Sequence, residues 1–115
     1  LLDLQRSQLE EILPNTPLRK RQAAHLQATY GLEALKIIQN SPKENRNPLS
    51  EVIPLCEAEI SHAIHHEHAH SPTDVLARRS RLAMVDLQEA ERLLPIVLNH
   101  FQDSFIEGKN IDLEN

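Results

Sequence analysis

The chain has 115 residues, a formal net charge of −5 and 40% apolar residues, but only two Phe and one Tyr. This length suits one domain, whose core must be built from Leu, Ile, Val and Ala. The acidic balance disfavours a nucleic-acid or anionic-membrane surface, because both need clustered positive charge.

Only two glycines and no β-branched runs predict an all-α fold, a small bundle of about six helices forming one domain over residues 1–115. Residues 41–54 hold three prolines and two asparagines, which predicts an ordered surface loop without a regular element. No apolar run approaches the roughly 20 residues that span a bilayer. The N-terminus lacks a signal-peptide pattern, and a first residue of Leu rather than Met favours a fragment or a processed chain.

Helices are expected where apolar residues recur at helical spacing between proline and glycine breaks. Thr16 is placed to cap the second helix, with Pro17 at its first position, and Leu32 is expected to face inward in the third. The expected helices cover residues 2–13, 17–30, 32–40 and 55–69, followed by one that opens at Ser71 and one that opens at Asp86.

Two capping boxes are predicted in the second half of the chain. Ser71 and Asp74 flank Pro72 at the start of one helix, and Asp86 and Glu89 open the last helix. Pro95 should kink or split that last helix, and residues 107–115 should fray. Its expected buried residues are Ala90, Leu94, Val97, Leu98, Phe101 and Phe105.

Opposite charges fall on the inward faces of neighbouring helices. Glu67 continues an apolar stripe, where a carboxylate is costly unless it is paired. We therefore predict a partly buried ion pair between Glu67 and Arg79, with Glu59 as the alternative carboxylate. Asp74 and Arg78 are spaced for a second pair along one helix.

The segment His66-Glu67-His68-Ala69-His70 matches the zinc motif H-E-x-x-H, and His62 extends its stripe by another four residues. A zinc protease needs the helix to run through its second histidine, but Pro72 requires this helix to end by His70. Catalytic zinc is therefore disfavoured, and adventitious metal binding by His62, His66 and His70 is the weaker alternative to a solvated, pH-sensitive helix flank.

The remaining reactive residues also favour structural roles. Cys56 is the only cysteine, so it cannot form an internal disulfide, and a reducing compartment fits. It lies on an apolar stripe, where a free cysteine is usually a small buried hydrophobe. The run Arg78-Arg79-Ser80-Arg81 could bind an anion, but nearby Asp74 and Asp86 favour ion pairs. No phosphate-binding glycine motif or nucleophile elbow is present.

A pattern across the middle of the chain resembles the C-terminal domain of FAD-dependent glycerol-3-phosphate dehydrogenases and the related α-glycerophosphate oxidases. The resemblance covers about residues 22–101, and its most specific part is the D-V-L-A-R-R-x-R-L-A segment. The residues that carry it are Tyr30-Gly31, Glu33-Ala34, Glu57-Ala58-Glu59, Glu67, the run from Thr73 to Ala83, Asp86 and Ala90.

The resemblance implies a helical accessory domain that follows a larger part holding FAD. The whole enzyme would oxidise glycerol 3-phosphate to dihydroxyacetone phosphate and pass electrons to quinone or oxygen. No catalytic, cofactor-binding or metal residue is carried over to this chain, which is expected to be non-catalytic alone. The segment of Arg78, Arg79 and Arg81 is expected to pack within the domain or against the larger part.

The resemblance also sets the expected partners: the FAD and substrate domain of the same chain, or another subunit, but neither nucleic acid nor membrane through this domain. A cytoplasmic location is expected, with the parent allowed to bind the inner membrane peripherally. Two alternatives stay open. One is a free-standing metal-binding helical protein that uses His62, His66 and His70. The other is a helical interaction module that uses Arg19–Arg21 or the arginine run.

Overall fold

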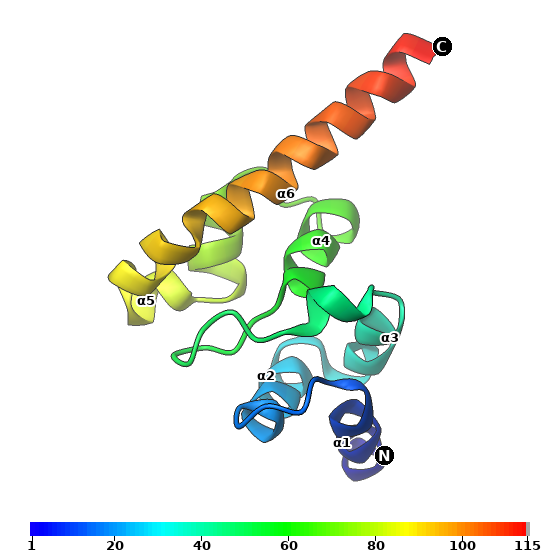
Figure 1. Ribbon diagram of the computed structural model, residues 1–115, viewed down its shortest axis with the longest axis vertical. Coiled ribbons are helices and arrows are strands. Elements are labelled where there is room, and N and C mark those ends of the chain that lie inside the picture. The colour runs from blue at the N-terminus through cyan, green and yellow to red at the C-terminus, as the bar shows by residue number, and fades with distance from the viewer. Residues whose placement is uncertain (115) are drawn as a thin grey trace. The chain divides into compact units, whose positions relative to one another are not determined.

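The computed structural model describes residues 1–114, and the side chains among them except those of residues 78, 79 and 105–114. These residues form helices and connecting turns without a strand, so the all-α prediction is confirmed (Figure 1). The elements are α1 (Leu2–Ile12), α2 (Arg19–Tyr30), the 3₁₀ turn η1 (Gly31–Glu33), α3 (Ala34–Gln39), the 3₁₀ turn η2 (Lys43–Arg46), α4 (Glu57–His66), the π-helical turn η3 (Asp74–Arg79), α5 (Leu82–Val85) and α6 (Leu87–Glu114).

The internal contacts divide the chain into two compact units, Leu1–Glu59 and the residues from Ile60 onward. The boundary falls inside α4, so the first turn of that helix belongs to the first unit. The single domain expected over residues 1–115 stays a prediction. In the described residues, no helix combines the length and the apolar character needed to cross a membrane.

The first unit has a core built by α1, α2, α3 and the residues at the start of α4. Small and branched side chains supply this core, as the scarcity of aromatics predicts. Tyr30 and Leu35 pack against its edge. The buried residues of the cluster are Leu9, Leu13, Ala23, Leu26, Ala34, Ile38, Cys56 and Ala58.

Gly31 causes the first departure from the expected faces. Its φ of 61° is a conformation that favours glycine, and η1 follows with three residues per turn instead of 3.6. This change of period rotates the faces, so Leu32 is 61% exposed while Ala34 and Ile38 are fully buried. The prediction that Leu32 faces inward is therefore wrong.

Thr16 behaves partly as predicted at the start of the second helix. Its Oγ1 accepts the backbone N–H of Leu18 at 3.2 Å, but α2 begins at Arg19, two residues later than expected. The hydroxyl therefore orders the turn that enters the helix.

The loop of residues 41–54 is ordered by arginines, and one regular turn forms within it. The 3₁₀ turn η2 contradicts the expectation that prolines and asparagines exclude any regular element. The guanidinium of Arg46 donates to Ser41 O at 2.8 Å and to Ile12 O at 3.3 Å. Arg21 donates to Glu51 O at 2.7 Å. Charged donors on backbone carbonyls thus hold this loop.

In the second unit, the capping signal at Ser71 is confirmed. Its Oγ accepts the N–H of Asp74 at 3.3 Å, and the Asp74 carboxylate accepts the N–H of His70 at 2.8 Å. The helix expected to follow is interrupted. It is wound as the π turn η3 and ends where Arg81 takes a left-handed φ of 62°, after which α5 begins.

The last helix opens at Asp86, whose carboxylate accepts the N–H of Glu89 at 3.1 Å. The carboxylate of Glu89 accepts hydrogen bonds from Arg92, and the N–H of Asp86 donates to Leu82 O at 2.7 Å. The expected frayed end at residues 107–115 is wrong for the described part, because α6 continues to Glu114. Pro95 lies inside this helix and does not split it.

The buried face of α6 differs in phase from the prediction. Ala90, Leu93 and Val97 are buried, whereas Leu94 and Leu98 are more than a third exposed. The apolar face is wider than the core can cover, because it includes Leu93, Leu94, Val97 and Leu98. The spacing alone therefore does not decide which of these residues point inward. The predicted burial of Phe105 concerns a side chain outside the described set.

Candidate functional site: a buried histidine–glutamate pair

The histidine-rich segment does not form the helical zinc motif. The helix α4 ends at His66, three residues earlier than expected, and His68 adopts a left-handed φ of 59°. The N–H of Ala69 then donates to Ala63 O at 2.8 Å and closes the helix end. Since Glu67, His68 and His70 follow the helix, the H-E-x-x-H residues do not share one helical face.

Two of the three proposed metal ligands do remain neighbours. His62 and His66 lie one turn apart on α4, with ring centroids separated by 5.2 Å. Within the part of the chain that the structure describes, no three side chains of His, Cys, Asp or Glu gather closely enough to hold a metal ion. Structural zinc sites use four protein ligands and catalytic ones use three, so this pair alone does not make either kind.

The structure describes only part of the arginine run. The side chains of Arg78 and Arg79 lie outside the described set, so their pairing with Asp74, Glu67 or Glu59 stays a prediction. Arg81 is exposed and holds the left-handed turn between η3 and α5.

The structure instead brings together two residues from α2 and α4. His25 Nε2 lies 2.7 Å from Glu59 Oε1, and the two side chains are only 13% and 7% exposed. His25 is presented by α2 next to the core residue Leu26. Glu59 lies in the first turn of α4, where the helix dipole favours a negative charge.

A second hydrogen bond fixes the carboxylate. Glu59 Oε2 accepts the backbone N–H of Cys56 at 2.8 Å, and the N–H of Glu59 donates to Cys56 O at 3.0 Å. This is the reach-back half of a capping box, with cysteine in place of serine or threonine. Both oxygens of a buried carboxylate are thereby satisfied, one by a backbone donor and one by an imidazole.

The electrostatics of the pair follow from burial and from the short contact. Burial by itself lowers the pKa of His25, but the hydrogen bond and the charge of Glu59 together outweigh it and raise that pKa above 6.5. The protonated imidazole and the carboxylate therefore stabilise each other at the junction of α2 and α4.

The thiol of Cys56 lies beside this pair and is shielded from solvent. Its side chain is fully buried in the core of the first unit. Burial and the nearby charge of Glu59 raise the pKa of the thiol well above its usual value, so the reactive thiolate is suppressed. The sequence-based interpretation of Cys56 as a small buried hydrophobe is confirmed.

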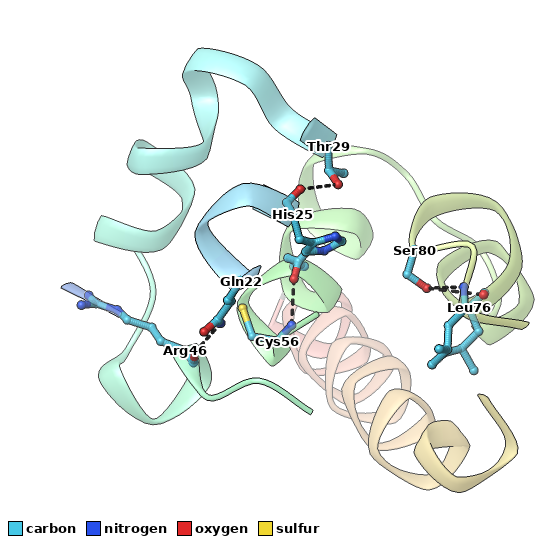
Figure 2. A network of polar contacts seen from close by, with 9 residues as sticks. Gln22, His25, Thr29, Arg46, Cys56, Leu76 and Ser80 are labelled. Atoms are coloured by element: carbon cyan, nitrogen blue, oxygen red, sulfur yellow. Dashed lines mark hydrogen bonds and ion pairs between the residues drawn. The ribbon is translucent and has the colours of Figure 1, made fainter. Parts of the chain in front are cut away.

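Gln22, one turn before His25, is a second buried polar residue that the sequence did not single out. Its Nε2 donates to Arg46 O at 2.7 Å, a contact drawn in Figure 2. Among the described residues, its Oε1 has no hydrogen-bond partner. Gln22 thus links α2 to the η2 turn at the cost of one unsatisfied acceptor.

One signal in the sequence bears on these residues. A glutamate three positions after Cys56 has capping-box spacing, which predicts that Glu59 is held at the helix start. Gln22 and His25 flank the core positions Ala23 and Leu26, but nothing in the sequence identifies their partners. Their contacts span 24 and 34 residues, so only the tertiary fold defines them.

These contacts link elements, and they do not form a flavin site. FAD-binding domains place a glycine-rich turn between a strand and a helix. Residues 1–114 contain no strand, and the two glycines of the chain, Gly31 and Gly108, are far apart in the sequence. The residues present therefore do not fit an FAD phosphate site, and no step of flavin chemistry is assigned to them.

Comparison with known proteins identifies the family to which this chain belongs. A family model described as the C-terminal domain of alpha-glycerophosphate oxidase matches residues 3–106. The chain is 32% identical over 89 residues to the probable mitochondrial glycerol-3-phosphate dehydrogenase of Dictyostelium discoideum, which covers 76% of this chain and 14% of that protein.

It is 36% identical over 87 residues to the mitochondrial glycerol-3-phosphate dehydrogenase of Homo sapiens, covering 70% of this chain and 12% of that protein. The chain thus spans only 12–14% of the length of these relatives. No solved structure gives a significant match. The match across residues 3–106 shows that this chain belongs to the family of C-terminal domains of alpha-glycerophosphate oxidase.

Proposed function

We propose that this chain is the helical accessory domain of an FAD-dependent glycerol-3-phosphate dehydrogenase. The observation that carries the proposal is the family match over residues 3–106, in a chain whose described residues do not fit a flavin site. The whole enzyme would oxidise glycerol 3-phosphate to dihydroxyacetone phosphate. Its FAD would accept the two electrons within the larger part of the chain.

The role of the domain itself is to brace that larger part, or to contact another subunit. Its own polar residues serve its folding: Glu59 and His25 join α2 to α4, and Arg46 holds the 41–54 loop. The segment of Arg78, Arg79 and Arg81 belongs to the region that resembles the family most specifically. We therefore infer that it contributes to packing within the domain or against the larger part.

The location of the parent protein belongs to the same proposal. The named relatives are mitochondrial proteins, whereas the sequence was expected to belong to a cytoplasmic protein. Cell fractionation with an antibody against residues 1–115 distinguishes the two locations.

The experiment that tests the proposal compares the longer protein with residues 1–115 alone. We expect the longer protein to carry yellow FAD and to reduce a quinone analogue or oxygen when glycerol 3-phosphate is added. Residues 1–115 alone should carry no flavin absorbance and catalyse no oxidation. A longer protein that binds no flavin, or that ignores glycerol 3-phosphate, would contradict the proposal.

A further inference from the structure

The residues where α4 begins are packed into the core of the first unit. Leu55 and Cys56, directly before the helix, are 1% and 0% exposed, and Ala58 and Glu59 in its first turn are also buried. We call residues 55–59 the α4 start. It contains the only thiol of the chain, that of Cys56. Chemical access to this thiol therefore reports whether the α4 start is packed or open.

One side chain joins the α4 start both to its own backbone and to α2. The Oε2 atom of Glu59 accepts the N–H of Cys56 at 2.8 Å, and its Oε1 atom lies 2.7 Å from His25 Nε2. Figure 2 shows His25 and Cys56 within the same group of polar contacts. Because a single carboxylate makes both contacts, a change of charge on His25 acts on the group that caps the Cys56 N–H.

The charge on His25 sets the strength of this connection. A protonated imidazole makes a charge-assisted hydrogen bond to the carboxylate, which is roughly twice as strong as the neutral bond that remains after deprotonation. Glu59 is buried, and it is the charged group that raises the pKa of His25. Other charged groups on α2 and on the elements packed against it are exposed or donate to backbone carbonyls: Arg6 on α1, Arg21 on α2, Glu33 in η1, Lys36 on α3 and Arg46 in η2.

A rise in pH therefore weakens the connection between α2 and the α4 start. The pKa of His25 is raised in the folded chain, so the packed α4 start binds the proton more tightly than an open one. The stabilisation is complete below the ordinary value of 6.5 and is lost as the pH rises through the raised pKa. Deprotonation leaves the buried carboxylate of Glu59 without an opposite charge, which is costly.

Opening of the α4 start does not require the whole first unit to unfold. Residues 55–59 are the last ones of this unit, whereas the other buried core residues come from α1, α2 and α3 and from Leu13, and these three helices pack against one another. A segment at the edge of a packed unit opens at a smaller free energy than the unit as a whole. The loss of the charged contact thus acts first on the α4 start.

We propose that the His25–Glu59 pair is a pH switch on the α4 start. With His25 protonated, the α4 start is packed and the Cys56 thiol is shielded. When His25 loses its proton, the equilibrium shifts toward a locally open form in which electrophiles reach the thiol. All residues of the switch lie within this chain, so the inference does not depend on the proposed function.

The test measures alkylation of Cys56 by iodoacetamide in residues 1–115 from about pH 5.5 to about pH 8.5, the range in which histidine titrates. The thiolate displaces iodide and forms one carbon–sulfur bond, which mass spectrometry detects. Each rate is divided by the rate of the urea-unfolded chain at the same pH, so that ionisation of the thiol itself cancels. We expect this ratio to rise about fivefold with pH, because a neutral hydrogen bond replaces a charge-assisted one.

Two variants and one control assign the cause of the rise. Glu59→Gln removes the charge that pairs with His25, and His25→Gln leaves a donor beside Glu59 that carries no charge at any pH. In both variants the ratio should be higher than in the unchanged chain at low pH and should no longer rise with pH. Glu11→Gln removes an exposed carboxylate from α1 of the same unit, so its ratio should rise as in the unchanged chain.

Three results would overturn the inference. A ratio that does not rise with pH in the unchanged chain would show that His25 does not control the α4 start, and an equal rise in Glu59→Gln would assign the effect to another group. A ratio that equals the equilibrium constant of global unfolding at each pH, measured by urea denaturation, would show that Cys56 is exposed only when the whole chain unfolds. The first and third results need only the unchanged chain, so the decision does not depend on whether the variants fold.

Discussion

Removing the Glu59 carboxylate tests how the first unit is held together. In the Glu59→Ala variant His25 loses its ion-pair partner while remaining buried, and the Cys56 N–H loses its acceptor at the start of α4. Breaking a buried ion pair lowers the free energy of unfolding by about 3–5 kcal/mol, and losing a helix cap lowers it by about 1 kcal/mol. The two losses do not simply add here, because one carboxylate makes both contacts. Because His25 keeps some access to water, we expect the free energy of unfolding to fall by about 3 kcal/mol.

The assay is urea denaturation of residues 1–115 at pH 6, where His25 is protonated. The matched control is Glu11→Ala, since Glu11 is an exposed glutamate on α1 of the same unit, and its loss should change stability by less than about 0.5 kcal/mol. If Glu59→Ala and Glu11→Ala have the same midpoint, then the His25–Glu59 pair does not hold α2 to α4 and the reasoning is wrong.

The pH dependence of stability checks the same pair independently. The pKa of His25 is raised in the folded protein, because Glu59 outweighs the effect of burial. The folded state therefore binds the proton more tightly than the unfolded state. The stabilisation is fully present below the ordinary value of 6.5 and is lost as the pH rises through the folded pKa. Glu59→Gln, which removes the charge with little change in volume, should remove this loss. Parallel pH profiles for the two proteins would contradict the assigned cause.

Three further variants or treatments test other contacts. Arg46→Ala removes the donors to Ser41 O and Ile12 O, so stability should fall by about 2 kcal/mol and limited proteolysis should cut faster within residues 41–54. Ser71→Ala removes an N-terminal cap and should cost about 1 kcal/mol, measured by thermal unfolding against the exposed control Ser7→Ala. Equimolar zinc should leave the melting temperature unchanged, because His62 and His66 offer only two ligands; a chelator-sensitive rise would revive the metal-binding alternative.

The helical class and the family followed from the sequence because both depend on local signals. Ser71 and Asp86 cap helices where their spacing predicted, and the D-V-L-A-R-R-x-R-L-A segment carried the family resemblance now confirmed across residues 3–106. Capping needs only a few neighbouring residues, so local spacing is sufficient to predict it.

The faces of the helices were harder to predict, since they depend on period and on tertiary contacts. The 3₁₀ turn at Gly31 rotated Leu32 outward, and the π turn η3 with left-handed Arg81 split a helix expected to be continuous. The recurrence of apolar residues every 3.6 positions does not predict such changes of helical period. On α6, Leu93 is buried and Leu94 is exposed, although both lie on a wide apolar face.

Only one of the two residues of the candidate site, Glu59, could be predicted from the sequence. Glu59 had recognisable capping spacing after Cys56, but its imidazole partner lies 34 residues earlier in the chain. Arginines are the usual partners of buried carboxylates, so the glutamates were predicted to pair with arginines and His25 was not predicted as a partner. Single-sequence patterns carry no information about which distant residue meets which.

The most direct test of the central claim is to truncate the longer protein immediately before Leu1 and to measure its glycerol 3-phosphate oxidation, flavin content and melting temperature beside the complete protein. If this chain is an accessory domain that braces a flavoenzyme, the truncated protein should lose activity and unfold at a lower temperature. A truncated protein that retains its flavin, its full oxidation rate and its melting temperature would contradict the account.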